Sequence, residues 1–449
     1  MTVVYTSPSV SEDLARIASK AVTVSARIKS TRHLLDWLSC AVAASTDPAR
    51  TPWLKLSGNR LRHELALCDT EMQPLMVALV DGAAGSVLEM DDVHRDAVLH
   101  PGPVVIPAAL AAARLSPTTA HVLADAIVVG YEVMIRIGRG MGLGHYRYWH
   151  PTSTCGPFGA AAAAGRVLGL DVDQMTWALG NAGTRTGGLW QLRHEPVPSK
   201  AVHTAFGAQS GLLAALLARQ GFAGPRRLIE GKQGLLAATA PDADAGKMID
   251  EDPDWLIHQV SFKPWPACRH AHPAIDALLA LPELPSADAV SRIDVDTYRE
   301  AIDFCDCPHP DTPTRARFSI QHALAAILVQ GRPGLAQYEA SNLTVPEIAR
   351  LREKIRVREH PQFVEAFPGH YGARVTIETS DDRTLSAEVS DAWGDPEWPL
   401  GDEDLAAKAR DLLAAAGWSE TKIEDVISHT LALMDNNDLP GWLALLEAT

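Results

Sequence analysis

The sequence lacks the cysteine pattern of a secreted, disulfide-bonded protein. Only six of its 449 residues are cysteines, and they follow no regular spacing: Cys40, Cys68, Cys155, Cys268, Cys305 and Cys307. Scattered thiols of this kind are typical of a reducing compartment. We therefore expect a cytoplasmic protein.

Long apolar runs are missing as well. No stretch of the sequence reaches the ~20 consecutive apolar residues that a membrane-spanning helix needs. The first residues also lack the basic head and apolar segment of a secretory signal. The sequence thus predicts a soluble, unexported chain without a membrane partner.

The sequence has fewer basic than acidic residues. The chain has 40 Lys and Arg residues against 55 Asp and Glu residues, which gives a formal charge of −15. Nucleic-acid binding depends on clusters of Lys and Arg that neutralise phosphates. No such cluster is visible in the sequence, so we expect no nucleic-acid partner.

Aliphatic side chains are abundant. Hydrophobic residues make up 47% of the sequence, which indicates a globular protein. A chain of 449 residues is too long for one ordinary core and should form two or three domains. Small and aliphatic residues recur every three or four positions, and this spacing predicts helices over residues 31–45, 73–90, 104–115, 119–138, 156–168, 174–188 and 204–220. We predict an all-helical domain over residues 1–264, completed by residues 400–449.

The pattern changes after Pro264. Polar and apolar residues alternate over 291–298, 354–360, 371–379 and 384–390, which predicts strands, and the last two flank a hairpin turn at 380–383. Helical patterns lie among them at 272–281, 318–331 and 345–353. We therefore predict an α+β unit over residues 265–399, and a fold class of mainly α with an α+β second domain.

One short segment, residues 88–101, is unusually rich in titratable groups. It contains Glu89, Asp91, Asp92, His94, Arg95, Asp96 and His100 between two alanine-rich helical stretches. Burying an unpaired charge costs several kcal/mol. This segment is therefore either a solvated loop or a site where charges are held together for chemistry.

Three further polar clusters stand where apolar helices begin. They contain Tyr146 and His150, then Lys200 and His203, and finally Lys263, Arg269, His270 and His272. Each cluster alone has an ordinary explanation, such as helix capping by Thr152 or Ser153. Together, in an acidic protein, they indicate one converging pocket for a small polyanion.

Two other motifs point elsewhere but are weak. The glycine-rich run at 138–144 follows a helical pattern and misses the G-x-G-x-x-G spacing of a dinucleotide loop. The segment from Cys305 to His309 has metal-ligand residue types without a second ligand pair at the required spacing. We expect a loop there and no bound nucleotide.

Five stretches between residues 88 and 331 resemble the MmgE/PrpD family, in family order. They read LEMDDVH with LHPGPVVIPAALA, GHYRYWHPTSTCGPFGAAAAAGRVLGLD, SKAVHTAFGAQSGLLAALLA with GFAGP, KPWPACRHAHPAIDA, and ARFSIQHALAAILVQG. The family includes 2-methylcitrate dehydratase, cis-aconitate decarboxylase and iminodisuccinate epimerase. The resemblance implies a large helical domain built from both termini, a smaller inserted α+β domain, a homodimer, and an active site in the cleft without metal or other cofactor.

The resemblance also implies roles for particular residues. The family's catalytic positions correspond to His100, His150, Lys200 and His272, and its acidic positions to Asp91 and Asp92. Three departures count against decarboxylation: Glu89 replaces a frequent aspartate, Val93 replaces a frequent threonine, and the decarboxylase's small-domain tyrosine corresponds to Phe318 or His322. The GHY…WHPTST and Lys-x-Trp-Pro-x-Cys stretches look closest to the epimerase.

The reactions of this family share the transfer of a proton at a carbon next to a carboxylate. The enolate that forms needs nearby cations or hydrogen-bond donors. We expect Lys200 to stabilise the developing charge and Arg269 to orient a carboxylate. His100 is the expected acid or base, oriented by Asp91 or Asp92, and His150, His272 and Tyr146 are candidates for the opposite side. Substrate contacts are expected from Glu89, His94, Arg95, His203, Lys263, Arg269 and His270.

Two competing hypotheses remain open on the sequence. Glu89, Asp91, Asp92, His94 and His100 could hold a divalent ion for metal-assisted hydrolysis. The chain could also be a non-catalytic carboxylate-binding protein that keeps the family fold. The sequence does not choose among dehydratase, epimerase and decarboxylase activity.

Overall fold

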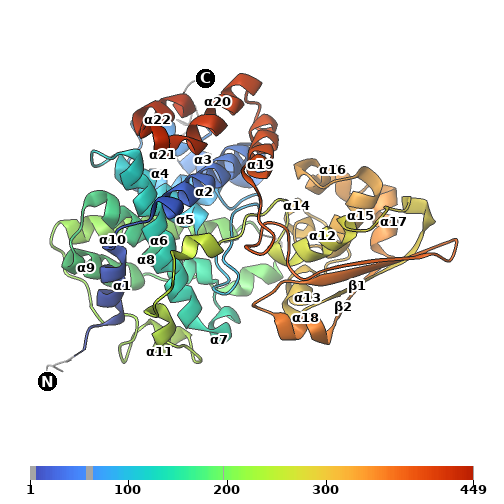
Figure 1. The fold of residues 1–449 in the computed structure, drawn as a ribbon, viewed down its shortest axis with the longest axis horizontal. Helices are drawn as coiled ribbons and strands as arrows, with labels where there is room; N and C mark the ends of the chain where they lie inside the picture. Colours follow the sequence, from blue (N-terminus) through green and yellow to red (C-terminus); the bar gives the residue numbers. More distant parts are fainter. Residues whose placement is uncertain (1–6, 57–63, 196, 448–449) are drawn as a thin grey trace.

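The helical part of the protein is built from both ends of the chain. The computed structural model describes residues 7–56, 64–195 and 197–447. Its longer N-terminal helices are α1 (Val10–Ala18), α2 (Val24–Ala43), α4 (Pro74–Ala84), α5 (Gly102–Ala113), α6 (Ala120–Met141), α8 (Pro151–Leu168), α9 (Val172–Gly183) and α10 (Lys200–Arg219). The C-terminal helices α19 (Asp402–Ala415), α20 (Glu420–Leu431), α21 (Leu433–Asn436) and α22 (Leu439–Glu447) pack onto this bundle (Figure 1). Short helices α3 (Thr51–Leu56), α7 (Leu143–Tyr146) and α11 (Leu235–Thr239) complete it.

One hydrophobic core joins these two chain segments. It runs from Val10 through α2 and α4 to α10, and it includes Leu405 and Trp442 of the C-terminal helices. Trp442 is 1% exposed, so the C-terminal helices are a structural part of the bundle. A bundle of this size can bury helices that are apolar nearly all round.

The central helices approach one another closely because their contacts are made by small residues. A methyl group at Gly211 of α10 would lie 2.4 Å from the Cβ atom of Ala160 in α8. A methyl group at Gly159 of α8 would lie 2.7 Å from the Cβ atom of Met134 in α6. α10 is also apolar and long enough to cross a membrane, but 56% of its apolar window is buried inside the protein, as in the core helix of a globular protein.

The smaller part contains a four-stranded mixed sheet with helices (Figure 1). The sheet order is β2-β1-β3-β4, with β1 and β2 parallel and the other pairs antiparallel. The strands are β1 (Val290–Thr297), β2 (Ile355–Glu359), β3 (Ala373–Thr379) and β4 (Thr384–Val389), and the helices are α12 (His272–Leu279), α13 (Arg299–Cys305), α14 (Pro313–Ala316), α15 (Ile320–Gln330), α16 (Ala340–Leu343), α17 (Pro346–Arg352) and α18 (Pro361–Ala366). In β3 the side chains of Ala373, Val375 and Ile377 alternate into a second hydrophobic core. The predicted fold class, mainly α with a small α+β part, is confirmed.

Two helix boundaries differ from the prediction in ways that matter for function. The helix predicted over 73–90 ends at Ala84, and the chain then turns into a buried loop that carries the acidic residues. The helix predicted over 204–220 begins earlier, at Lys200, so Lys200 and His203 lie within its first turn. Hydrophobic spacing alone does not show either change, because both boundaries are set by polar contacts with distant segments.

Candidate active site

A cavity lies where the helical bundle meets the α+β part. Residues of both parts line it, as is common for small-molecule sites. Its polar lining is Glu89, His100, Tyr146, His150, Lys200, Arg269 and His270. Its other lining residues are Val93, Val98, Trp190, Cys268, Phe304, Phe318 and Tyr371. A wider outer cavity, here called the vestibule, shares five of these residues: Glu89, Trp190, Lys200, Phe304 and Phe318.

The loop between α4 and α5 brings strained backbone to this cavity. Glu89 has a φ of 56° and Val98 a φ of 49°, a left-handed conformation that costs most for a β-branched residue. Strain of this kind persists only where surrounding contacts over-determine the backbone, and it clusters at functional sites. Both residues line the cavity, so the strain lies at the candidate site itself.

His100 presents one ring nitrogen to the cavity in a defined tautomer. Its Nδ1 atom lies 2.8 Å from the carbonyl oxygen of Asp92 and 3.2 Å from a carboxylate oxygen of Asp91. A carbonyl oxygen only accepts hydrogen bonds, so Nδ1 carries the hydrogen and Nε2 carries the lone pair. Burial, with Lys200 and Lys263 nearby, holds the pKa of His100 well below 6.5. At neutral pH this residue is therefore an uncharged base.

His150 lies at the N-cap of α8, directly before Pro151. Proline is favoured at this first helical position, and the backbone N–H of His150 donates to the carbonyl of Gly188 at 2.7 Å. Gly188 has a φ of 97°, and a side chain there would collide with Ser153. The rings of His150 and His100 are 6.2 Å apart, and burial, with His203, Lys200 and His100 nearby, holds the pKa of His150 well below 6.5.

Lys200, in the first turn of α10, is paired with Glu89. Its Nζ atom lies 2.7 Å and 2.6 Å from the two carboxylate oxygens of Glu89. Burial lowers the pKa of Lys200, but the nearby carboxylates of Glu89 and Asp91 more than offset this, so the pKa is raised overall. The cavity therefore contains a charged ammonium group at neutral pH.

The wall contributed by the α+β part is polar, and most of its polar groups are bonded to other protein groups. The Nδ1 atom of His270 lies 2.8 Å from the hydroxyl of Tyr298, and burial lowers the pKa of His270 to about 3. Arg269 lies 2.5 Å from Asp395 and donates to the carbonyls of Ala392 and Trp393. The guanidinium of Arg269 is thus held in place by protein groups.

The structure does not place His272 in the cavity lining. Its Nδ1 atom lies 3.3 Å from Arg269, and its Nε2 atom lies 3.2 Å from the carbonyl oxygen of Ala267. Arginine only donates and a carbonyl only accepts, so both ring nitrogens are engaged. The predicted role of His272 as an acid or base therefore does not fit its position, and its neighbour His270 lines the cavity instead.

Asp92 and Lys263 lie behind the cavity wall. Asp92 accepts hydrogen bonds from Tyr131 at 2.6 Å and from the backbone N–H of Gly102 at 2.8 Å, and it lies 2.7 Å from His33. Burial raises its pKa to about 7. Lys263 is fully buried and donates to the carbonyl oxygen of Glu89 at 3.1 Å. These residues shape the loop that carries Glu89 and His100, and the structure does not place them in the cavity lining.

Asp91 belongs to the same supporting layer. One of its oxygens lies 3.3 Å from Lys263 Nζ and the other 3.2 Å from His100 Nδ1. The carboxylates that a metal-assisted hydrolase would need as ligands, Glu89 and Asp91, are therefore paired with Lys200 and Lys263. This pairing does not favour the metal hypothesis.

His94 and Arg95 point away from the cavity. Buried His94 accepts a hydrogen bond from the backbone N–H of Ala97 at 3.2 Å, and burial lowers its pKa to about 3. Arg95 pairs with Asp391 at 2.8 Å and Glu397 at 2.7 Å. The prediction that His94 and Arg95 bind substrate therefore does not fit their positions.

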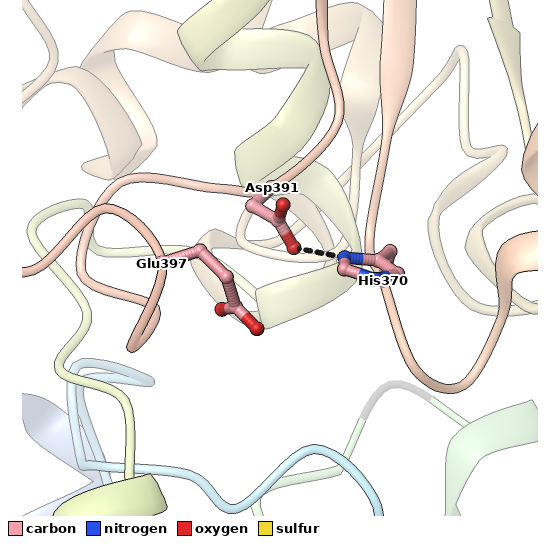
Figure 2. Close-up of side chains that lie close together, drawn as sticks. All are labelled: His370, Asp391 and Glu397. Atoms are coloured by element: carbon pink, nitrogen blue, oxygen red, sulfur yellow. Dashed lines mark hydrogen bonds and ion pairs between the residues drawn. The ribbon is translucent and has the colours of Figure 1, made fainter.

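Ion pairs with Arg95 account for the one group of potential metal ligands found among the described residues. His370, Asp391 and Glu397 lie close together outside the cavity lining, and His370 Nδ1 lies 2.8 Å from Asp391 (Figure 2). The guanidinium of Arg95 already forms an ion pair with each of the two carboxylates. This cluster is explained as an ion-pair network that connects the 88–101 loop to residues 391–397.

Two aromatic residues of the cavity, Trp190 and Phe304, were not predicted from the sequence. Trp190, in the turn Trp190–His194, packs 4.3 Å from His150, and Phe304 of α13 stacks 5.6 Å from Tyr146. Trp190 follows Gly188, and that glycine was the available signal for a turn close to the site. Phe318 lines the cavity 5.9 Å from Lys200. His322 instead bonds the carbonyl of Gln337, so Phe318 is the position that faces the site.

Comparisons with known proteins agree with this architecture. The family model for the MmgE/PrpD N-terminal domain matches residues 11–247, and the model for the C-terminal domain matches residues 265–432. A cis-aconitate decarboxylase-like protein, oryM, of Aspergillus oryzae is 28% identical over 94% of this chain and 93% of its own length. The cis-aconitate decarboxylase of Mus musculus is 26% identical over 84% of this chain and 80% of its own, and that of Aspergillus terreus is 26% identical over 92% and 90%.

Proposed function

Because this chain belongs to the MmgE/PrpD family, whose relatives indicate a lyase-type enzyme, we propose that it moves a proton at the carbon next to a carboxylate of a small di- or tricarboxylic acid. The reaction needs no cofactor in this proposal. The observation that carries it is the meeting, in one cavity, of two uncharged imidazoles and a charged ammonium group: His100, His150 and Lys200.

His100 serves as the base. Its Nε2 lone pair takes the proton from the α-carbon, and the electron pair of the C–H bond moves into the carboxylate to give an enolate. Backbone and carboxylate groups of Asp92 and Asp91 at Nδ1 stabilise the imidazolium that forms. Because its pKa lies below neutral, His100 is already unprotonated at neutral pH and can accept a proton. Proton transfer from the α-carbon to such a weak base is unfavourable unless the enolate is stabilised.

Lys200 supplies that stabilisation. A substrate carboxylate that reaches Nζ shares the ammonium with Glu89, and the charge of the enolate grows on the oxygens nearest to it. Fixed charges in a buried site act more strongly than in water and need no reorganisation. Glu89 keeps Lys200 charged in the empty site and holds it in position.

His150 acts on the other side of the substrate. When protonated at Nε2, it delivers a proton to a leaving hydroxyl in dehydration or to the opposite face of the carbon in epimerisation. Trp190 packs against its ring and fixes its orientation. Tyr146 of α7, whose hydroxyl lies 3.5 Å from Nε2 of His270, is the alternative donor.

Decarboxylation is the second candidate because two of the relatives described above are named cis-aconitate decarboxylases and the third is named as similar to one. The same groups would then deliver a proton to the carbon that carbon dioxide has left. Phe318 places a ring without a hydroxyl beside Lys200, so this chain has one donor fewer there than a tyrosine would supply. We therefore favour dehydration or epimerisation.

A panel of acids in deuterated water tests the proposal. The purified protein is incubated with succinate-, citrate- and aspartate-like acids and with cis-aconitate, and NMR follows deuterium incorporation, loss of water and loss of carbon dioxide. We expect deuterium at an α-carbon of at least one acid, and its strong reduction in His100→Asn. A protein that binds an acid but exchanges no proton in any of them would be a carboxylate-binding protein instead.

A further inference from the structure

Two histidines form a directly bonded pair that leads out of the cavity. The Nδ1 atoms of His150 and His203 are 2.9 Å apart, so one ring donates a hydrogen to the other. His203 lies in the first turn of α10, three residues after Lys200. A hydrogen bond between two neutral imidazoles leaves the second nitrogen of each ring free for another partner.

The two rings face different surroundings. His150 is 1% exposed and lines the cavity, and no hydrogen-bond partner is recorded for its Nε2 atom among the described residues. His203 lines neither the cavity nor its vestibule, and it is partly exposed. The pair therefore connects the cavity to a partly exposed residue that lies outside both linings.

The charged, doubly protonated form of either ring is unfavourable. Burial, with Lys200 nearby, lowers the pKa of His203 to about 4, and the pKa of His150 is lowered by burial and by His203, Lys200 and His100. Lys200, paired with Glu89, is a charged group that lowers the pKa of both rings. A proton that reaches this pair is thus passed on.

We propose that His203 is a proton-relay and positioning residue, which exchanges the proton of His150 with solvent while substrate fills the cavity. This inference rests on the proposed function. A proton arrives at Nε2 of His150, the Nδ1 hydrogen of His150 moves to Nδ1 of His203, and the Nε2 hydrogen of His203 leaves to water. In the reverse sequence water protonates Nε2 of His203, the Nδ1 hydrogen of His203 moves to Nδ1 of His150, and the Nε2 hydrogen of His150 passes to the substrate. No bonds change at the two rings other than N–H bonds.

His203 also helps to hold the ring of His150 in position. Its ring lies 5.1 Å from the ring of His150, on one side, while Trp190 packs at 4.3 Å. These contacts hold His150 with Nε2 toward the cavity. His203 touches no cavity space, so its effect on catalysis passes through His150.

The test compares His203→Gln with His309→Gln, an exposed histidine outside the cavity and vestibule. Glutamine keeps a hydrogen-bonding group near His150 but does not relay protons by tautomer exchange. We expect kcat of His203→Gln to fall roughly tenfold or more, with KM little changed. We also expect less solvent deuterium to be delivered from His150 to the substrate per turnover, because the proton of His150 then exchanges more slowly with solvent.

Chemical rescue separates relay from structure. Added imidazole should restore the rate of His203→Gly in a saturable manner and should not accelerate the native protein or His309→Gln. A wild-type rate and exchange ratio in a correctly folded His203→Gln would overturn the relay alone. Absence of exchange by the native protein with every acid would overturn the proposed function and the relay together. A ¹⁵N coupling between the two Nδ1 nuclei checks the shared hydrogen independently of activity, and its absence would also contradict the pair.

Discussion

The two walls of the cavity use similar residues in different ways. On the helical wall, His100 and His150 each bind a protein group through Nδ1 and leave Nε2 toward the cavity. On the α+β wall, His270 binds Tyr298 through Nδ1 and has its Nε2 atom 3.5 Å from the hydroxyl of Tyr146, and both ring nitrogens of His272 are engaged by Arg269 and the carbonyl of Ala267. Residue type therefore does not decide the function of a histidine here, whereas the partner of each nitrogen does.

This difference suggests a division of labour. The helical wall carries the base, the ammonium group and the relay, all within rigid helix ends and one strained loop. The α+β wall gives the cavity its shape through satisfied hydrogen bonds and the ion pair between Arg269 and Asp395. The following predictions test whether chemistry belongs to one wall and shape to the other.

The largest expected effect comes from comparing His100→Asn with His272→Asn. Removing the base should lower kcat by about 10²–10⁴-fold with a small change in stability. Removing His272 should instead reduce the free energy of unfolding by about 1–3 kcal/mol, because buried partners lose their hydrogen bonds, and should change kcat little. Turnover and urea unfolding of both variants provide the measurement. The reverse pattern would assign the chemistry to the α+β wall.

The next effect concerns the ion pair in the cavity. Lys200→Met should lower kcat/KM by about 10²–10³-fold, because the enolate loses its stabilising charge. It should also destabilise the fold by about 3–5 kcal/mol, because Glu89 is left buried without its main partner. The double variant Lys200→Met/Glu89→Gln should regain most of the stability and none of the activity. Recovery of activity in the double variant would show that the charge of Lys200 is not needed.

A pH profile tests the state of the helical-wall base. The pKa of His100 is held well below 6.5 by burial and nearby lysines, so its basic form predominates at every pH above that value. We expect kcat/KM to stay constant as pH falls from 8 to 6.5 and to decline only in clearly more acidic solution. An acid limb with its midpoint at or above 6.5 would mean that His100 is not the base or is not buried in this way.

The smallest expected effect is at the vestibule. Arg193 lines it with its guanidinium 4.5 Å above the ring of Phe304, and no carboxylate partner is recorded for it among the described residues. It is therefore available for a distal carboxylate of the substrate. Arg193→Ala should raise KM by about tenfold with kcat nearly unchanged, because charged hydrogen bonds contribute about 1.5–3 kcal/mol when well formed. An equal loss in kcat would instead give Arg193 a part in the transition state.

Hydrophobic spacing predicted the helices well because burial enforces it. α6 and α15 lie close to their predicted ranges, and the alternation over 371–379 corresponds to β3. The end of α4 at Ala84 was not predictable, because the chain leaves the helix to place Glu89 against Lys200, which is distant in sequence. The predicted homodimer stays a prediction.

The site was predictable as a set of segments but not residue by residue. Polar clusters before apolar helices indicated the segments of Glu89, His100, His150 and Lys200, which the structure places around one cavity. The choice between His270 and His272 depends on which ring nitrogens are already bonded, and sequence does not encode this locally. Trp190 and Phe304 were missed because aromatic residues at a cavity wall have the same spacing as aromatic residues in a core.

The most direct test of the central claim is deuterium incorporation at an α-carbon, followed by NMR for the native protein and His100→Asn with the same acid. We predict ready incorporation by the native protein and a rate at least about 100-fold lower in the folded variant. Equal incorporation by both proteins would contradict the assignment of His100 as the base on the helical wall.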